Sequence, residues 1–176
     1  MVCTVARRSL AKCPKSLQKY GFCGLLAVIY AAKLGMPANQ AQLRALFNKV
    51  KRICALPPGK WINAVPKRQG GISFEHTICL LEHFKTCNFR EIHLDTNSKI
   101  TLATWLRTQT TARTSYIVHV GSHAFYVHVA SSVRKWTLYD QRGPQNKCDL
   151  ADLTKKGGHG RKLVRRVLQI EDLVLT

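Results

Sequence analysis

The first half of the chain has apolar residues at helical spacing. Residues 22–34 carry almost no polar side chain and end at Gly35, which predicts a helix buried on most of its sides. Residues 39–52 predict a second helix, with Asn39 as a favourable N-cap, an apolar stripe on one side and basic residues on the other. Residues 73–85 predict a third helix with one apolar face. The N-terminal half is therefore expected to be helical.

The second half changes to the period of β-strands. Residues 116–120, 123–129 and 135–139 are rich in aromatic and β-branched side chains and are separated by turn signals, which predicts an antiparallel meander. Helices followed by strands are typical of the α+β class. The remaining elements are expected to be strands at 89–94 and 163–170 and a short helix at 101–108.

A chain of 176 residues is long enough to bury a sizeable core as one domain. Residues 53–72 contain several prolines and glycines and predict a long loop, a kind of segment that often carries function. The basic chain up to residue 20 is expected to run over the surface. Within the single domain, 1–176, we distinguish a basic N-terminal segment at 1–15, a core at 16–145 and a basic C-terminal extension at 146–176 that completes the sheet.

Charge is the most unusual feature of the composition. Lys and Arg outnumber Asp and Glu by 28 to 9, a formal net charge of +19, whereas 45% hydrophobic residues is a globular value. The charge is therefore expected on the surface of a folded body, where it attracts phosphate backbones, anionic membranes and acidic proteins, or serves solubility alone. Residues 157–162 are the best local candidate for a phosphate contact, although a flexible basic hairpin is the stronger interpretation.

Seven scattered cysteines, an odd number, indicate free thiols in a reducing compartment. No signal-peptide pattern opens the chain, and the longest apolar run, residues 22–32, is too short to span a bilayer. We therefore expect a soluble, cytoplasmic protein. The small size and high charge fit a viral or phage protein, or an effector that acts in the cytoplasm of a host cell.

Three residues form a candidate catalytic set. Cys23 lies at the start of the buried helix, where the helix dipole stabilises a thiolate. His123 opens a strand after a Gly-Ser turn, and Asp140 ends the next strand, so antiparallel pairing can bring the carboxylate to the imidazole. Taken singly, each residue is more often structural: a buried thiol, a core or surface histidine, a turn aspartate. Two other histidines compete for the role of base, His119 and His128.

Cys23 on its buried helix, with Gly-Ser-His-Ala-Phe-Tyr-Val at 121–127 and Trp-Thr-Leu-Tyr-Asp at 136–140, resembles the papain-like cysteine peptidases. The small bacteriocin-processing, viral and effector-type domains of that superfamily are the most similar, and the resemblance covers roughly residues 16–145. It implies a papain-like α+β fold, in which a helical half carrying the nucleophile packs on a C-terminal antiparallel sheet. It also implies hydrolysis of peptide or isopeptide bonds in a protein or peptide substrate, without a cofactor or a metal.

By the same resemblance, Cys23 attacks the carbonyl carbon, His123 moves the proton and Asp140 orients the imidazole ring. Gln18, five residues before the cysteine, is the candidate for the glutamine that helps to stabilise the oxyanion, a contribution typically of about 3 kcal/mol. The residues expected to border the substrate cleft are Gly21, Gly24, Trp61 and Ser122.

Other functions remain open at this point. The same triad would serve an amidase, a deamidase or an acyltransferase. A catalytically silent papain-like domain would instead bind nucleic acid or a protein partner through its basic surface. Trp61, Trp105 and Trp136 would offer stacking to nucleic acid, although their apolar surroundings indicate core positions.

A metal site is a further alternative. Cys79, His83 and Cys87 recur at every fourth residue across a predicted helix, close to His76, and one helical face can present two zinc ligands. No closely spaced cysteine pair accompanies them, and Phe84 lies among them as a core residue would. A structural zinc is therefore the weaker interpretation.

Overall fold

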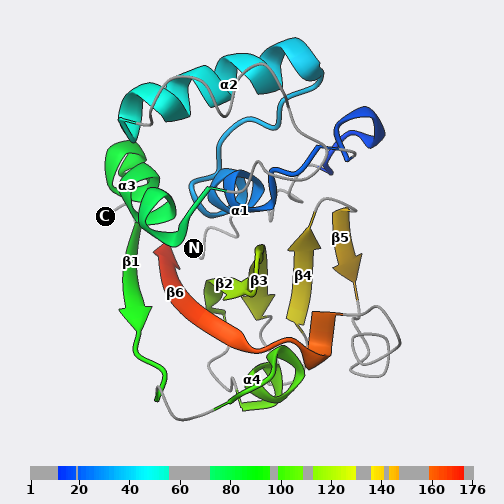
Figure 1. Ribbon diagram of the computed structural model, residues 1–176, viewed down its shortest axis with the longest axis vertical. Helices are drawn as coiled ribbons and strands as arrows, with labels where there is room; N and C mark the ends of the chain where they lie inside the picture. The colour runs from blue at the N-terminus through cyan, green and yellow to red at the C-terminus, as the bar shows by residue number, and fades with distance from the viewer. Residues whose placement is uncertain are drawn as a thin grey trace, which may run out of the picture.

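In the computed structural model, the described residues form a six-stranded antiparallel sheet with helices on both of its faces (Figure 1). The structure describes residues 12–18, 20–55, 72–95, 99–108, 113–129, 136–140, 143–146 and 159–172. The helices are α1 (Cys23–Ala31), α2 (Gln40–Ile53), α3 (Phe74–Phe84) and α4 (Leu102–Thr108), with 3₁₀ turns η1 (Lys15–Leu17) and η2 (His159–Arg161). The strands are β1 (Cys87–Ile92), β2 (Ser115–Val120), β3 (His123–Val129), β4 (Trp136–Asp140), β5 (Gly143–Asn146) and β6 (Val164–Asp172). The predicted α+β class is confirmed.

The strand order is β1-β6-β2-β3-β4-β5. Strands β2 to β4 form the predicted antiparallel meander, and β5 extends it. The turn between β2 and β3 is tight because Gly121 adopts a φ of +58°, which a residue with a side chain rarely does. The last strand, β6, is inserted between β1 and β2 and pairs with both. The C-terminal part of the chain therefore lies inside the sheet.

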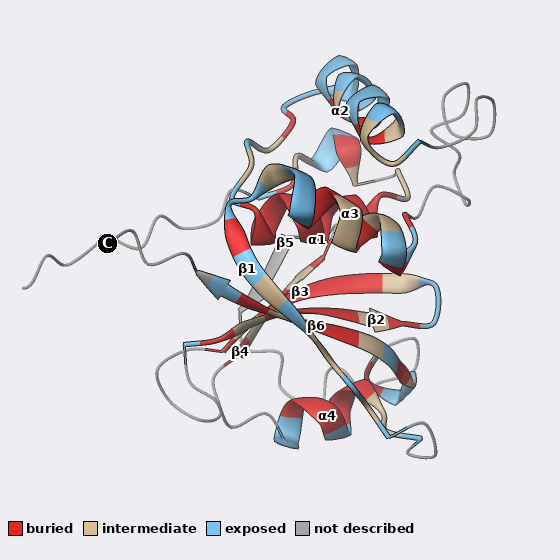
Figure 2. Ribbon diagram, turned by 90° about the vertical axis from the view of Figure 1, so that its left-hand side faces the viewer, coloured by how far each residue is buried: buried red, intermediate tan, exposed pale blue. Residues whose placement is uncertain are grey.

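Helix α1 is the centre of the larger core. All nine of its residues are buried, and it packs on β3, where the rings of Tyr30 and Tyr126 lie 5.9 Å apart. Helices α2 and α3 lie outside α1, so α1 is enclosed between them and the sheet (Figure 2). This arrangement explains why the helix has no polar side, since full burial of a Leu or Ile contributes about 1.5–3 kcal/mol.

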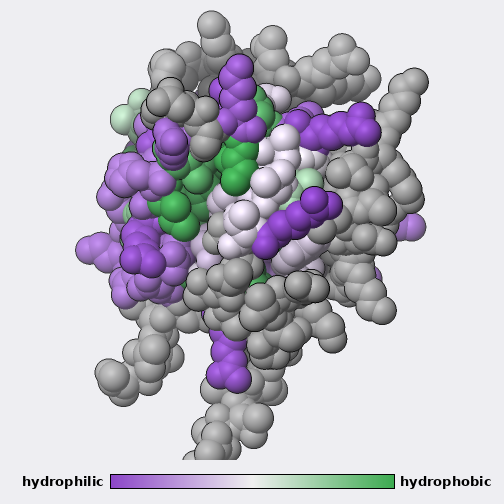
Figure 3. Space-filling model, turned by 90° about the horizontal axis from the view of Figure 1, so that it is seen from below, coloured by the Kyte–Doolittle hydropathy of each residue, from purple (hydrophilic) through white to green (hydrophobic). Residues whose placement is uncertain are grey.

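A second core fills the opposite face of the sheet. Trp105 of α4 packs edge-on against Tyr116 at a ring distance of 5.2 Å, and Phe125 joins the same cluster. Figure 3 shows the α4 side of the molecule, where hydrophilic side chains lie beside a smaller hydrophobic area. Along β3 the even-numbered Ala124 and Tyr126 face α1, while Phe125 and Val127 face α4, the alternation expected of a strand covered on both sides.

Local signals in the sequence mark the helix starts. The Asn39 side chain accepts a hydrogen bond from the N–H of Gln42 at 3.0 Å and caps α2. Ser73 forms a capping box with His76, in which the Ser73 Oγ accepts from the His76 N–H at 3.1 Å and the His76 Nδ1 accepts from the Ser73 N–H at 3.2 Å. Both predicted helix starts are confirmed.

Three expectations need correction. The chain before α1 does not simply run over the surface, because Cys13 and Leu17 are buried in the core next to α1. The first helix ends at Ala31 rather than near residue 34, and Lys33 takes a left-handed φ of 52°. Strand β5 was not predicted, since Gly143–Asn146 contains no β-branched or aromatic residue and pairs only because β4 lies beside it.

None of the helices that the structure describes combines the length and the apolar character needed to cross a membrane.

Candidate active site

Cys23 is the first residue of α1, and its thiol faces the N-terminal turn of that helix. The N-cap residue Phe22 offers no side-chain hydrogen bond, so the first backbone N–H groups of α1 have no side-chain cap. The N–H groups of Cys23 and Gly24 instead hydrogen-bond to the Cys23 sulfur, and the N–H of Ala124 in β3 adds a third bond. The sulfur therefore lies where the end of a helix meets the start of a strand.

The pKa of Cys23 is set by opposing effects. Burial of the side chain raises the pKa, and the negative charge of Asp140 raises it a little further, whereas the three backbone N–H groups lower it by stabilising a thiolate. Burial is the largest of these effects, so the resting group is a neutral thiol at pH 7. A base is required before this sulfur can act as a nucleophile.

His123 opens β3, one residue before Ala124, the residue that reaches the thiol. Its ring stacks on the ring of His159 at a centroid distance of 4.6 Å and packs against Phe125 at 4.5 Å. His159 belongs to η2, which directly precedes β6 in the chain. Its contact with His123 places η2 beside the start of β3. The imidazole therefore lies with Phe125 on the α4 side of the sheet, whereas Ala124 faces α1.

Asp140 is the last residue of β4 and is 6% exposed. Its charge raises the pKa of three groups around it, the thiols of Cys13 and Cys23 and the phenol of Tyr30, so the carboxylate lies in the neighbourhood of the candidate nucleophile. An aspartate that serves only a turn is normally exposed. Burial beside the thiol therefore favours a functional role over that of a turn residue.

The other predicted site residues differ in how well they fit their expected roles. Gln18 follows η1, and its Nε2 donates to the carbonyl oxygen of Cys13 at 3.2 Å, which leaves the second amide hydrogen for another acceptor. Gly21 has open space where a side chain would lie, and Ser122 is exposed in the turn before His123. Trp61 lies outside the described residues.

The interpretation of Gly24 needs correction. A Cβ at this position would lie 2.7 Å from Cγ1 of Ile72 and 3.2 Å from its carbonyl oxygen. Gly24 is therefore required because the chain entering α3 passes directly over the first turn of α1. The absence of a side chain at Gly24 gives room to Ile72, and not to a substrate.

The rival histidines have separate surroundings. His119 is directly opposite Ala124 in the β2–β3 register, packs edge-on against Phe74 at 5.0 Å, and burial lowers its pKa to about 4. His128 lies within 3.0 Å of the Ser115 Oγ, which accepts a hydrogen bond from the Tyr126 hydroxyl. His128 is thus part of a structural polar network, and His119 remains the nearer competitor to His123.

Sequence reasoning missed two features of this region. His159 was considered only as part of a basic hairpin, although its ring stacks on His123. Arg166 of β6 makes two hydrogen bonds to Glu91, at 2.8 and 3.0 Å, a further ion pair with Glu75, and a cation–π contact with Phe74 at 3.8 Å. This guanidinium ties α3 and β1 to β6. No local sequence signal marks either contact, since the partners are distant in the chain.

The alternative zinc ligands do not gather. The Cys79 thiol donates to the carbonyl of Ile53 at 3.7 Å, His83 is exposed and lies edge-on to Phe84, and Cys87 is buried in β1. Within the described ranges, no three or more His, Cys, Asp or Glu residues group so as to hold a metal ion. The tryptophans Trp105 and Trp136 are core residues, at 2% and 9% exposure, rather than stacking platforms.

Comparison with known proteins gave no match to any family model, curated protein or solved structure. The class of this protein is therefore described from its fold and its candidate site alone. The protein is an α+β domain in which a buried thiol at a helix N-terminus, a histidine at a strand start and a buried carboxylate at a strand end come from α1, β3 and β4.

Proposed function

We propose that the protein is a cysteine hydrolase that cleaves peptide or isopeptide bonds, with Cys23 as nucleophile, His123 as general acid–base and Asp140 as the group that orients the imidazole. One observation supports the proposal: the Cys23 sulfur lies at the N-terminus of α1, near the backbone N–H of Ala124 and in the field of the buried Asp140 carboxylate. Cys23, His123 and Asp140 come from three different elements, α1, β3 and β4.

The reaction follows from these positions. His123 takes the thiol proton of Cys23, and the thiolate attacks the substrate carbonyl carbon to form a tetrahedral oxyanion. The backbone N–H groups of the first turn of α1 stabilise that negative charge. Collapse of the intermediate breaks the C–N bond, the amine leaves with the proton from His123, and a water molecule activated by the same imidazole then releases the acyl group from sulfur.

The raised pKa of Cys23 gives the proposal a sharp test. Burial alone makes alkylation of this thiol by iodoacetamide slow until the pH exceeds the ordinary thiol range, because only the thiolate reacts. A catalytic imidazole reverses that expectation. We therefore expect Cys23 to be alkylated selectively below pH 8, at least 10-fold faster than the half-exposed Cys79, as followed for each cysteine by mass spectrometry.

Matched variants separate the candidate bases. His123→Ala is expected to lower the alkylation rate of Cys23 at pH 7 by about 100-fold, the scale of general-base catalysis, and Asp140→Asn by a smaller factor. His119→Leu removes the rival histidine and is expected to leave the rate unchanged. If Cys23 reacts only above pH 9, or if His119→Leu abolishes the reaction while His123→Ala does not, the proposed triad is wrong.

Hydrolysis itself is tested with a quenched-fluorescence peptide library and with isopeptide-linked peptides. Cleavage that is lost in Cys23→Ala supports a peptidase. Acyl-probe labelling of Cys23 without cleavage of either library points instead to an amidase, deamidase or acyltransferase with the same residues.

A further inference from the structure

The charge of this protein is distributed unequally along the chain. Residues 1–74 contain 13 Lys and Arg residues and no Asp or Glu, and all nine acidic residues lie from Glu75 onward. Helix α2, at Gln40–Ile53, belongs to the part without acidic residues and carries no carboxylate of its own. Its positive charge is therefore not neutralised within the helix, where acidic neighbours three or four residues away would normally pair with it.

The outer face of α2 is exposed, and among its basic residues Lys49 lies over the Phe84 ring, 5.0 Å from the ring centroid. Leu43, Phe47 and Val50 anchor the opposite face in the core. Arg44 and Arg52 are exposed and form no ion pair or hydrogen bond with any residue that the structure describes. Arg166, by contrast, is engaged with Glu75 and Glu91.

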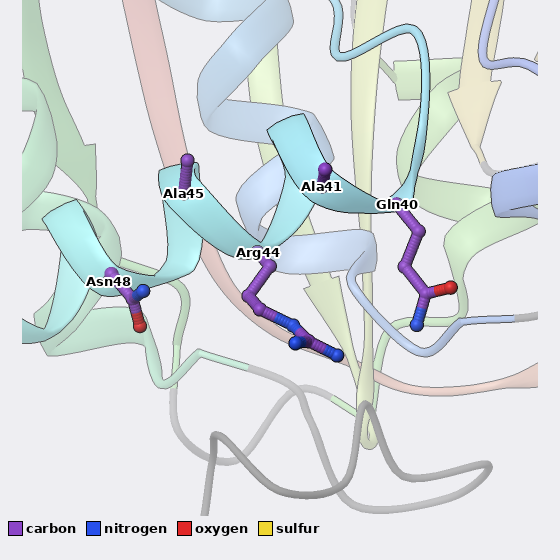
Figure 4. A pocket seen from close by; sticks show the side chains of 5 residues that line it. All are labelled: Gln40, Ala41, Arg44, Ala45 and Asn48. Atoms are coloured by element: carbon purple, nitrogen blue, oxygen red, sulfur yellow. The ribbon is translucent and has the colours of Figure 1, made fainter.

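A shallow hollow with a volume of about 410 Å³ lies on this face. Gln40, Arg44 and Asn48 are spaced by four residues and point to the same side of the helix, while the short Ala41 and Ala45 keep the surface open (Figure 4). An amide, a guanidinium and a second amide in a row are the groups that bind phosphates and read the edges of adenine and guanine.

We propose that the outer face of α2 is a docking surface for duplex DNA, in which Arg44, Lys49 and Arg52 bind phosphates and the row of Gln40, Arg44 and Asn48 lies against the groove. A helix of 14 residues is about 21 Å long and fits the major groove of B-form DNA, which is about 12 Å wide. The deep, narrow major groove of A-form RNA does not admit a helix.

Other polyanionic partners fit this face less well. A helix that lies on a membrane needs an exposed apolar side, whereas the apolar stripe of α2 is buried in the protein. Protein interfaces depend on aromatic anchors, and single-stranded nucleic acid binds by stacking on aromatic rings. The only aromatic residue of α2, Phe47, is buried.

The test measures fluorescence anisotropy of a labelled 24-base-pair DNA duplex at several KCl concentrations. The test variant is Arg44→Gln/Lys49→Gln/Arg52→Gln. The control variant, Lys99→Gln/Arg107→Gln/Arg113→Gln, removes the same charge from three exposed positions. Arg107 lies in α4 and Lys99 shortly before it, on the side of the sheet opposite α2 (Figure 2). We expect the test variant to raise Kd at least 10-fold and to reduce the slope of log K against log [KCl] by about 2–3, since each phosphate contact contributes about 0.9.

The control variant is expected to raise Kd less than 3-fold, and Cys23→Ala not at all, which separates this surface from the proposed hydrolase. Equal losses in the two triple variants would mean diffuse attraction by the net charge and would overturn the proposal. So would α2-dependent binding to phosphatidylserine vesicles, to poly-glutamate or to a single-stranded oligonucleotide that exceeds binding to the duplex. Thermal unfolding of every variant verifies that the fold is retained.

Discussion

At the scale of single residues, two buried thiols show what the N-terminus of α1 provides. Cys13 and Cys23 are both desolvated and both lie near the charge of Asp140, which raises the pKa of each. For Cys13, which has no stabilising backbone N–H groups, the pKa rises to about 11. Cys23 receives three backbone N–H groups that oppose the rise. Position at a helix end, and not burial, is therefore what distinguishes the candidate nucleophile.

The pKa of His119 predicts a loss of stability in mild acid. Burial, aided by the positive charge of Arg166, lowers the pKa of His119 to about 4, whereas an unfolded histidine has a pKa of about 6.5. Below pH 6.5 the unfolded state therefore binds a proton that the folded state refuses, and stability falls as the pH falls toward 4. We expect urea unfolding to show about 2 kcal/mol lower stability at pH 5 than at pH 7.5 from this group.

Substitution isolates that contribution. His119→Leu removes the titrating group and the buried Nε2, which has no hydrogen-bond partner among the described residues. The pH 5 to pH 7.5 difference should shrink by about 2 kcal/mol in this variant. The exposed His83→Asn is the control and should retain it. An unchanged pH dependence in His119→Leu would show that this ring is not buried as described.

The identity of the candidate catalytic residues was readable from the sequence, but their surroundings were not. Cys23, His123 and Asp140 were chosen because their types and their positions at element ends suit the chemistry. The true constraint on Gly24 comes from Ile72, 48 residues later, and the stacking partner of His123 is His159, 36 residues later. Contacts of that kind depend on tertiary packing, which local pattern does not encode.

At the scale of elements, prediction succeeded where the signal was local. Asn39 and Ser73 mark helix starts because their side chains accept hydrogen bonds from N–H groups three residues away. Failure followed where the signal was not local. The segment containing Cys13 and Leu17 was read as surface from its basic neighbours, although its two apolar residues reach the core beside α1. Strand β5 exists through its pairing with β4 rather than through its own composition.

The packing of α2 against α3 can be tested through a pair of thiols. Cys54, the C-cap of α2, lies beside Cys79 of α3, and its thiol donates to the carbonyl oxygen of His76 at 3.9 Å. Burial together with the neighbouring thiol raises the pKa of Cys54 to about 12. Oxidised glutathione should convert the pair to a disulfide and release two molecules of reduced glutathione. Because the reacting form is the thiolate, the rate should rise steeply from pH 7 to pH 9. Mass spectrometry of a tryptic digest under non-reducing conditions detects the cross-link.

Single substitutions provide the controls for that experiment. Cys54→Ser and Cys79→Ser should each lose the cross-link, and neither should form one with Cys87, which is buried in β1. A disulfide between Cys54 and any other cysteine, or none at pH 9 with excess oxidant, would contradict the packing of the two helices.

At the scale of the whole molecule, the order of the strands was beyond the reach of the sequence. A strand at 163–170 was expected, and β6 occupies Val164–Asp172, but nothing in its pattern indicates that it separates β1 from β2. That insertion places Arg166 between Glu91 and Glu75. It also places His159 of η2 against His123, the first residue of β3. The global topology thus completes a candidate site whose chemical residues were visible locally.

The net charge of +19 leads to a prediction about the fold itself. Self-repulsion of like charges destabilises a compact state, and salt screens it, with a Debye length that falls from about 30 Å at 0.01 M to about 8 Å at 0.15 M. The ion pairs of Arg166 would be weakened by the same screening, but they are few and partly exposed, and such pairs contribute about 0–1 kcal/mol. Repulsion among the many basic residues should therefore outweigh them.

We accordingly expect thermal stability to rise with KCl between 10 and 300 mM. A gain of about 1 kcal/mol would appear as an increase in Tm of about 2–4 °C for a chain of this size. Binding to duplex DNA should respond in the opposite sense, because salt competes for the phosphates that α2 contacts. Sorbitol at equal osmolality is the uncharged control. A Tm that falls with salt would contradict this prediction. It would mean that attractive charge pairs, and not repulsion among the basic residues, dominate the surface.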